Sequence, residues 1–328
     1  MTGRVLVRCD GTEDTGLGHV SRCLALAEAL EERGAATLFC GAFGERAAGL
    51  LTAAGRPSQP AAPDLAELAR ERGCSAIVLD SYALDAQTLE ALAPARTGLG
   101  LLVIDDFAAF AEYPAGAIVL NFTVVARDLV YRGRDLVRLL GPEHLLVRRA
   151  LRELRARERT VRRPPRHVLM ALGGGDPFGL AVGLAGTLTR AFPELTVHLP
   201  ASAYGELPER VTALDDAQLA PGFAWADIAV TGGGLTKYEA AYLGVPPLAI
   251  SQSDGEAADT ERFVAAGLGA DAGHAASTGP EDRERALLRY VRDAALHDRL
   301  RAAAARVFPT DPTARVAEIV LETALMRP

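Results

Sequence analysis

The chain has 328 residues, of which 49% are hydrophobic and 5% aromatic, and its formal net charge is −7 at pH 7. This length allows two domains of ordinary size, and the composition is typical of a soluble, alanine-rich α/β protein rather than a disordered or fibrous chain. The negative charge gives no electrostatic support for nucleic-acid binding, although backbone dipoles can still hold a phosphorylated small molecule.

The cysteines and the apolar segments bear on the cellular compartment. The four cysteines, at positions 9, 23, 40 and 74, show no Cys-x-x-Cys spacing, so neither a zinc site nor a redox motif is indicated. We expect buried free thiols in a reducing cytosol. Residues 1–30 lack the pattern of a signal peptide, and no uncharged apolar run approaches the roughly 20 residues that span a membrane. The sequence predicts a cytoplasmic protein without a membrane span.

Strand-like apolar runs alternate with helix-period segments along the first half of the chain. The predicted strands are residues 4–8, 36–39, 76–79, 101–104 and 118–120, and the predicted helices include 20–33, 64–72 and 85–93. This rhythm predicts a mostly parallel sheet covered by helices on both faces.

A glycine-rich loop follows the first predicted strand, within residues 10–27, DGTEDTGLGHVSRCLALA. Glycines allow a tight backbone, and the helix that follows offers free N–H groups and the positive end of its dipole. His19 therefore lies at the carboxyl edge of a strand, where open α/β sheets bind ligands. Because the positive helix end disfavours an imidazolium, we expect a neutral imidazole that can act as a general base.

Residues 149–166, RALRELRARERTVRRPPR, interrupt the alternation. Dense arginine followed by two prolines indicates a charged connector and a break. A nucleic-acid patch is the alternative, but interleaved acidic residues and the absence of aromatic residues favour a solvated linker. We predict an N-terminal domain at 1–150 and a C-terminal domain at 151–328, whose residues 313–325 have helical periodicity.

The second half contains a further strand–glycine–helix segment. The predicted strands are residues 167–172, 196–199, 210–214, 228–231 and 247–250. Residues 231–239, TGGGLTKYE, follow one of them, and such a turn presents successive N–H groups to a phosphate. Thr236 can add a hydroxyl donor, and Glu239, one helical turn further, can bridge vicinal ribose hydroxyls. Residues 172–177, LGGGDP, form a similar turn, in which Asp176 and Pro177 are explained as a helix cap and the glycines leave ligand contact open.

Several other sites are disfavoured. There is no Walker A sequence, and the Gly16-x-Gly18 pair lacks the third glycine of a dinucleotide fingerprint. Asp-x-Asp is absent, and the five other histidines lack metal-ligand spacing. We therefore predict a site without a metal or cofactor.

The pattern Asp-Gly … Gly-x-Gly-His-x-x-Arg-Cys-Leu-x-Leu-Ala resembles the amino-terminal signature of the pseudaminic acid pathway UDP-sugar hydrolases, relatives of the MurG-type glycosyltransferases. The segment Glu239-x-x-x-Leu243-Gly244-Val245-Pro246 resembles the nucleotide-binding segment of the same superfamily. The resemblance implies a GT-B-like α/β fold, with two Rossmann-like domains of mostly parallel sheets facing a central cleft. It also implies that the last helix, about 312–328, packs back on the N-terminal domain.

The resemblance also implies site residues. Substrate or nucleotide contacts are expected at Asp10, Gly16, Gly18, Arg22, Gly174, Gly233, Gly234, Leu235, Thr236, Glu239 and Thr260. Besides His19, the catalytic residues implied are Asp259 and Tyr82, which lies in an Asp-x-Tyr segment where the family's tyrosine faces the sugar. Asp259 and Thr260 stand where the family has Asn-Gln before a helix, near the reacting sugar, so Asp259 changes the field beside the diphosphate. Asp105, Asp106 and Asn121 follow strands and either reach the cleft or cap loops.

Together these features predict hydrolysis of a UDP-linked amino-deoxy sugar, most nearly UDP-2,4-diacetamido-2,4,6-trideoxyhexose, to UDP and free sugar. His19 would activate water, and the anomeric carbon would invert because no covalent nucleophile is evident. The choice of uracil is carried by the resemblance. One alternative is a glycosyltransferase in which the same base deprotonates a small-molecule acceptor. A second is a non-catalytic nucleotide-sugar-binding or partner protein.

Overall fold

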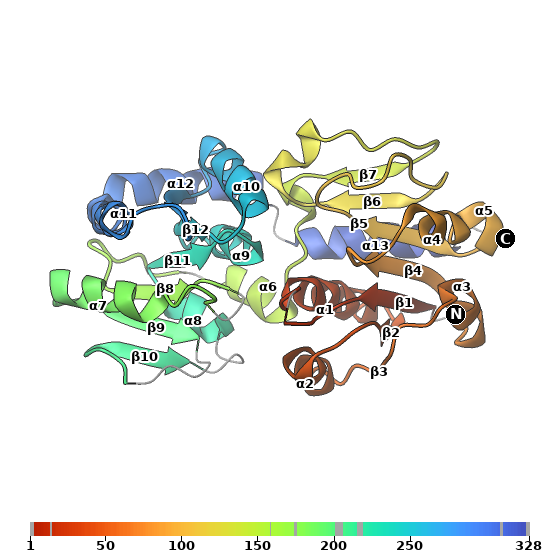
Figure 1. The fold of residues 1–328 in the computed structure, drawn as a ribbon, viewed down its shortest axis with the longest axis horizontal. Coiled ribbons are helices and arrows are strands. Elements are labelled where there is room, and N and C mark those ends of the chain that lie inside the picture. The colour runs from red at the N-terminus through yellow and green to blue at the C-terminus, as the bar shows by residue number, and fades with distance from the viewer. Residues whose placement is uncertain are drawn as a thin grey trace. The chain divides into compact units, whose positions relative to one another are not determined.

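The computed structural model describes residues 3–13, 15–157, 159–173, 176–200, 206–214, 219–308 and 311–325. The chain divides into two compact units, each built around its own parallel sheet (Figure 1). Unit 1 comprises Met1–Arg149 and Asp311–Pro328, and unit 2 comprises Ala150–Thr310.

Unit 1 contains a seven-stranded sheet in the order β3-β2-β1-β4-β5-β6-β7. Its strands are β1 Arg4–Cys9, β2 Ala36–Cys40, β3 Ser58–Gln59, β4 Cys74–Asp80, β5 Gly100–Ile104, β6 Ile118–Asn121 and β7 Val137–Leu140. The inner strands are buried along nearly their whole length, as expected for parallel strands covered on both faces. Because β1 lies between β2 and β4 and all pair in parallel, the loops after β1 and β4 leave the same edge of the sheet.

Helices cover this sheet and include one from the far end of the chain. They are α1 Gly18–Glu31, α2 Glu45–Ala53, α3 Leu65–Glu71, α4 Ala86–Ala91, α5 Pro94–Thr97 and α13 Pro312–Leu325, with short 3-10 turns at Val124–Asp128 and Pro142–His144. Helix α13 packs against α1, β4 and β5 (Figure 1). Its buried Val316 and Val320 belong to the same hydrophobic core as Val5 of β1.

Unit 2 contains a six-stranded sheet in the order β10-β9-β8-β11-β12-β13. Its strands are β8 His167–Ala171, β9 Thr196–Pro200, β10 Val211–Leu214, β11 Ile228–Gly232, β12 Pro247–Ser251 and β13 Ala270–His274. Its helices are α7 Ala181–Ala191, α8 Leu219–Trp225, α9 Leu235–Tyr242, α10 Asp254–Ala265, α11 Pro280–Arg292 and α12 Ala294–Val307, after α6 Arg149–Arg155 at the junction of the units. The loops after β8, β11 and β12 leave one edge of this sheet, because β11 lies between β8 and β12.

Two local expectations are corrected. The arginine-rich segment is not simply a solvated linker, because α6 occupies its first part and the Arg155 and Arg159 guanidinium groups donate to backbone carbonyls of unit 2. Asp176 does not sit at the N-cap position, since α7 begins at Ala181 after Leu180. The Asp176 carboxylate nevertheless accepts hydrogen bonds from the Leu180 and Ala181 N–H groups, so it satisfies this helix end from the preceding turn.

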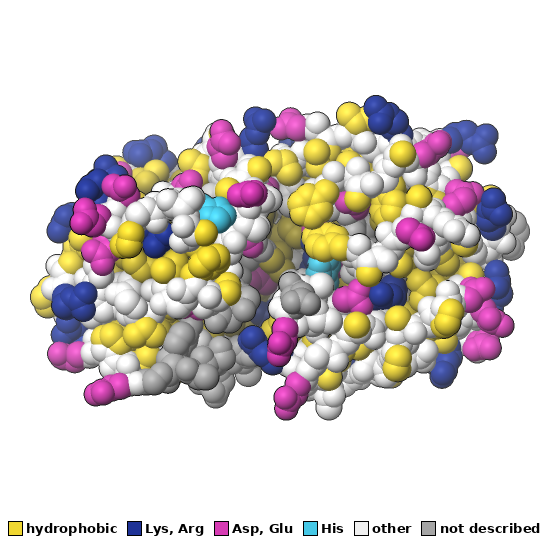
Figure 2. Space-filling model, in the orientation of Figure 1, with side chains coloured by type: hydrophobic (Ala, Val, Ile, Leu, Met, Phe, Trp, Pro, Cys, Tyr) yellow, Lys and Arg dark blue, Asp and Glu magenta, His cyan; other side chains and the backbone are white. Residues whose placement is uncertain are grey.

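The cysteines are buried as predicted, and the surface carries charges of both signs. All four cysteines are buried and free of disulfides, which confirms their prediction as buried thiols. Basic and acidic side chains are interspersed over the face seen in Figure 2, with small apolar areas between them. Among the described residues, no helix combines the length and the apolar character needed to cross a membrane.

Candidate functional site

His19 lies in the first turn of α1, and its ring contacts a buried carboxylate from another strand. Its Nδ1 atom is 2.6 Å from Oδ1 of Asp80, the last residue of β4. Asp80 is fully buried, and His19 is 6% exposed. The neighbouring positions of β1 and β4 bring these two residues together, because the β1–α1 loop passes the end of β4. The sequence pattern places Asp80 in the Asp-x-Tyr segment and indicates no role of its own for it.

Arg22, one helical turn after His19, fixes the same carboxylate. Its Nε donates to Asp80 Oδ2 at 2.6 Å and its Nη2 to Asp80 Oδ1 at 2.5 Å, which is the two-pronged geometry of a strong ion pair. Its Nη1 donates to Asp106 Oδ2 at 2.7 Å. The Cys23 thiol adds a weaker contact to Asp80 Oδ2 at 3.4 Å. The predicted ligand residue Arg22 therefore positions Asp80, and through it the imidazole.

The electrostatics of this cluster keep Asp80 ionised. Burial alone would raise the pKa of Asp80, but the charge of Arg22 and the interaction with His19 outweigh it and hold this pKa well below its usual range. Burial also opposes the charge on Arg22, yet Asp106 and Asp80 raise its pKa well above the ordinary value. An ionised Asp80 can only accept hydrogen bonds, so the proton between it and His19 belongs to Nδ1. A neutral imidazole with this tautomer carries its lone pair at Nε2.

An exposed aromatic pair lies beside the imidazole. The rings of His19 and Tyr82 meet edge to face with centroids 4.5 Å apart, and the Tyr82 hydroxyl donates to Asp106 Oδ2 at 2.9 Å. Phe107 continues the pair, with its ring centroid 5.5 Å from that of Tyr82. Both side chains are 56% exposed. Tyr82 thus joins the His19 cluster at a surface where an apolar or sugar ring can pack.

The glycine-rich loop before α1 is held by Asp10. Its carboxylate accepts hydrogen bonds from Arg8 Nη1 at 2.6 Å, the Ala42 N–H at 2.8 Å and the Ser81 hydroxyl at 2.5 Å. Burial would raise the pKa of Asp10, but these partners lower it overall. Gly16 has a φ of +66°, which favours glycine, and Gly18 begins α1. Ligand contacts of these three residues stay a prediction.

Asp105 and Asn121 cap loops. Asp105 accepts hydrogen bonds from the Phe107 and Ala109 N–H groups, each at 2.9 Å. Asn121 accepts from the Thr123 N–H at 2.8 Å. This confirms the loop-capping interpretation for both, whereas Asp106 belongs to the His19 cluster.

In unit 2, the predicted phosphate loop follows β11 and leads into α9. Gly234 precedes α9, Leu235 begins it, and no side chain caps this end from the N-cap position. A Cβ on Gly232 would lie 2.2 Å from the Leu172 carbonyl oxygen, and one on Gly233 would lie 2.8 Å from Cβ of Glu256, so packing requires both glycines. Thr236 lies half-buried in the first turn, and Glu239 is 4% exposed one turn later.

A fully buried lysine ties this loop to α10. Lys237 Nζ lies 2.7 Å from Asp259 Oδ2 and donates to Thr260 Oγ1 at 3.2 Å and to the Gly233 carbonyl. The Tyr238 hydroxyl also donates to Asp259, at 2.8 Å. Burial lowers the pKa of Lys237, and Asp259 opposes that shift. Asp259 and Thr260 thus have internal partners, and their proposed contacts with substrate are untested.

Helix α10 starts earlier than the resemblance suggested. It begins at Asp254, so Asp259 and Thr260 lie within the helix rather than before it. Ser253 caps this end by accepting from the Glu256 N–H at 3.3 Å, and Glu256 in turn accepts from the Gln252 N–H at 2.8 Å. The Ser-x-x-Glu pattern of Ser253 and Glu256 is a sequence signal that could have predicted this helix start. Sequence analysis missed Glu256, whose carboxylate lies beside the Gly233 loop.

Two further predictions concern Gly174 as a ligand contact and the absence of a metal site. Gly174 lies outside them. Among the residues with described positions, no group of three or more His, Cys, Asp or Glu side chains is arranged to hold a metal ion.

Comparison with known proteins shows the fold. Neither a protein-family model nor a curated protein sequence matches the chain. A solved glycosyltransferase of kitacinnamycin is similar, with a TM-score of 0.66 and 18% identity over 99% of this chain and all of that one. MurG of Acinetobacter baumannii has a TM-score of 0.66 and 15% identity over 98% and 99% of the two chains. The Streptomyces sp. SF2575 glycosyltransferase SsfS6, solved with thymidine diphosphate, has a TM-score of 0.64 and 15% identity over the same shares. With the two parallel sheets, these similarities confirm a GT-B-like fold of two Rossmann-like units.

Proposed function

We propose that the protein is an enzyme that transfers a glycosyl group from a nucleotide-sugar donor to an acceptor, with His19 as the general base. The observation that carries the proposal is the 2.6 Å contact between His19 Nδ1 and the ionised, fully buried Asp80. That contact orients the ring, leaves Nε2 as the proton acceptor and stabilises the imidazolium formed when a proton arrives, as in other His–carboxylate pairs.

The proposed reaction is a single displacement. His19 Nε2 takes the proton from an acceptor hydroxyl as the acceptor oxygen bonds to the anomeric carbon. The bond from that carbon to the diphosphate oxygen breaks, and the nucleoside diphosphate leaves with the electron pair. A good leaving group needs no second carboxylic acid. The product is expected to have the inverted anomeric configuration.

Leaving-group binding is assigned to unit 2. The free N–H groups at the start of α9, from Leu235 and Thr236, suit a diphosphate, and Glu239 one turn further suits a ribose. The identity of the base is left to experiment: the resemblance to UDP-sugar hydrolases implies uracil, whereas SsfS6 was solved with thymidine diphosphate.

Hydrolysis is the second candidate, favoured by the pattern of residues 10–27. The same base would then deprotonate water, and an amino-deoxy sugar would be released beside UDP. The solved neighbours named as glycosyltransferases support transfer over hydrolysis.

The test measures release of nucleoside diphosphate from a panel of UDP- and dTDP-sugars, in EDTA, with and without an acceptor library. Release that requires an acceptor would support transfer, and equal release without one would identify a hydrolase. In either case His19→Ala should lower kcat by roughly 10²–10⁴-fold. The matched control is His144→Gln, which changes a half-buried histidine outside the cluster.

Proton NMR of the first product formed gives the configuration. A retained anomer would contradict the single displacement. Undiminished turnover by His19→Ala would remove His19 as the base, and binding of nucleotide sugar with no turnover under any condition would support the non-catalytic alternative.

A further inference from the structure

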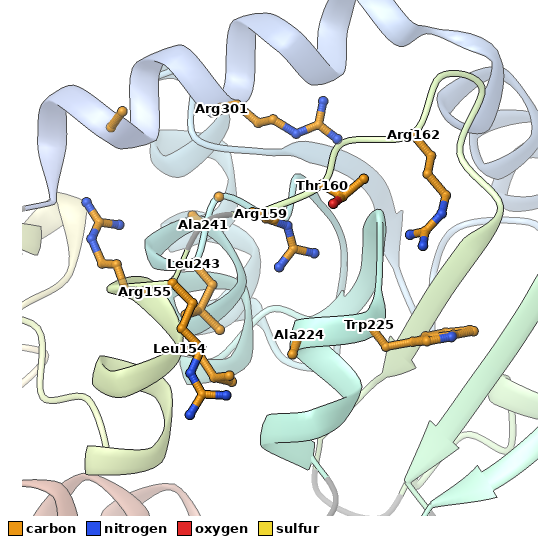
Figure 3. A pocket seen from close by; sticks show the side chains of 13 residues that line it. Leu154, Arg155, Arg159, Thr160, Arg162, Ala224, Trp225, Ala241, Leu243 and Arg301 are labelled. Carbon is orange, nitrogen blue, oxygen red and sulfur yellow. The ribbon is translucent and has the colours of Figure 1, made fainter.

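Unit 2 contains a cavity of about 530 Å³ whose walls carry five arginines (Figure 3). They are Arg155, Arg157, Arg159, Arg162 and Arg301. The first four come from α6 and the segment after it, and the fifth from α12. Among the described residues, no acidic side chain lines this cavity. Its size is in the range of small-molecule sites.

The cavity lies away from the predicted phosphate loop of the same unit. Its walls include Trp225 at the end of α8 and Leu243 and Gly244 just after α9. These positions directly precede β11 and β12, at the amino edge of the sheet. The Gly233 loop follows the carboxyl end of β11. The cavity is therefore separate from the site assigned to the nucleotide.

Two of the arginines are satisfied by carbonyl groups rather than by carboxylates. Arg155 donates to the Phe308 carbonyl at 2.7 Å and to the Tyr242 carbonyl. Arg159 donates to the Phe223 carbonyl at 3.0 Å and to the Ala226 carbonyl. Carbonyls at helix ends favour a cation, but they do not cancel its charge. Burial accordingly lowers the pKa of Arg155 and lowers that of Arg159 to about 10.

The other three arginines have two carboxylate partners between them among the described residues. The Arg157 side chain forms no hydrogen bond or ion pair with any residue that the structure describes, and its backbone N–H donates to the Leu154 carbonyl. Arg162 lies 3.3 Å from Asp227 Oδ1, and Arg301 lies 3.2 Å from Asp298 Oδ1. Arg163 shares Asp298 at 2.5 Å, so that carboxylate serves two cations. Among the described residues, the buried Nε–H of Arg301 has no hydrogen-bond partner.

We propose that this cavity binds a small anion with at least two negative charges, either inorganic diphosphate or the phosphate group of a small metabolite. Guanidinium groups match phosphate oxygens in paired hydrogen bonds, and Figure 3 shows Arg159 and Arg162 on the same segment as the Thr160 hydroxyl. A nucleic-acid strand fits less well, because the Trp225 indole already stacks on His167 and His198, with centroids 4.1 and 3.5 Å apart. A bound anion that contacts Arg159, Arg162 and Arg301 would join the segment after α6 to α12.

The experiment is calorimetric titration of the full chain with inorganic pyrophosphate in EDTA. Saturating UDP or dTDP is present in one series and absent in a second, because pyrophosphate can also compete for the proposed nucleotide site. The test variant is Arg157→Gln/Arg162→Gln, which leaves the carbonyl-bonded Arg155 and Arg159 in place. The control is Arg285→Gln/Arg289→Gln on α11, which removes the same charge from exposed positions. Thermal unfolding verifies that each variant is folded.

The expected result is pyrophosphate binding that the test variant weakens about tenfold or more and the control about twofold or less. No binding, or equal weakening by both variants, would overturn the proposal. Repeating the titration with glucose 6-phosphate distinguishes a metabolite phosphate from free diphosphate. If no nucleotide binds but pyrophosphate still binds and the test variant weakens it, the proposed function is wrong and the anion site in the cavity is supported.

Discussion

Asp80 is fully buried at the end of β4 and accepts hydrogen bonds from both His19 and Arg22. An amide in its place can donate a proton toward His19 Nδ1, which favours the tautomer whose Nε2 carries the proton. Asp80→Asn should therefore lower kcat by roughly 10²–10⁴-fold with little change in KM. The measurement is steady-state kinetics on a donor from the panel, with Asp85→Asn at the cap of α4 as the matched control. A fall no larger than that of the control would show that Asp80 only supports the fold.

His297 gives a pH-dependent contribution to stability. It is 2% exposed on α12, and burial lowers its pKa to about 4. Between the unfolded value near 6.5 and this folded value, the unfolded chain binds a proton that the folded chain does not. Stability therefore falls as pH drops from about 6.5 to about 4, by up to about 3 kcal/mol from this group.

Urea unfolding of wild type and His297→Leu at pH 7.5, 5.5 and 4.5 measures this contribution. A leucine cannot titrate, and it loses only the hydrogen bond between the imidazole and the Tyr290 backbone, because Nε2 has no partner among the described residues. As the pH falls, the free energy of unfolding of the variant should decrease less than that of wild type. Parallel pH curves for the two proteins would contradict the assignment to His297.

Helices α9 and α10 are joined by the buried Lys237 and the partly buried Asp259, 2.7 Å apart. Removing one member strands the other charge, so Lys237→Met should cost about 3–5 kcal/mol in free energy of unfolding. Asp259→Asn should cost a similar amount, because it leaves the fully buried Lys237 without its carboxylate, although the amide still accepts a hydrogen bond from the Tyr238 hydroxyl. The double variant should lose less free energy of unfolding than the two single variants lose together.

A double-mutant cycle in urea measures that coupling, expected at about 1–3 kcal/mol. Because Lys237 also donates to the Gly233 carbonyl, its loss should weaken nucleoside diphosphate binding as well. Additive losses would show that the two side chains do not depend on each other.

Features whose sequence signals are local could be predicted, and features that depend on distant residues could not. His19 and the Gly233 loop could be found because a strand, glycines and a helix start lie within a few residues. The contacts of Asp80 and Asp106 with the His19 cluster could not be predicted, because Asp80 lies 61 positions from His19 and Asp106 lies 84 from Arg22. Only the order of β1, β4 and β5 brings them together. The strands β3, β7 and β13 were missed because β3 has two residues, β7 has four of which two are exposed, and β13 has a weak apolar pattern.

The arginine-rich segment at residues 149–166 was predicted as a solvated linker, and this prediction was incomplete. Its charge pattern was the correct observation, but solvent is not the only partner for arginine. Arg155 and Arg159 donate to carbonyls near the ends of α9 and α8, which are far away in the sequence. Periodicity and composition carry no information on such contacts, so a connector was predicted where part of a cavity wall exists.

At the scale of the whole molecule, unit 1 is completed by the last described helix. Val316 and Val320 of α13 are buried in the same core as α1 and the strands of unit 1, although almost the whole of unit 2 intervenes in the sequence. If each unit has its own core, loosening α13 should destabilise unit 1 alone. Val320→Ala should cost roughly 1–3 kcal/mol through lost burial and the cavity left behind.

Hydrogen exchange followed by mass spectrometry measures where that cost appears. In Val320→Ala, protection should fall in β1, β4 and β5 and stay unchanged in β8, β11 and β12, because exchange reports the opening of separate cooperative parts. The matched control is Val130→Ala, which makes the same change at a side chain that is 62% exposed. Equal loss of protection in both sheets would mean that the two units open as one, and the division of the chain into two independent cores would then be wrong.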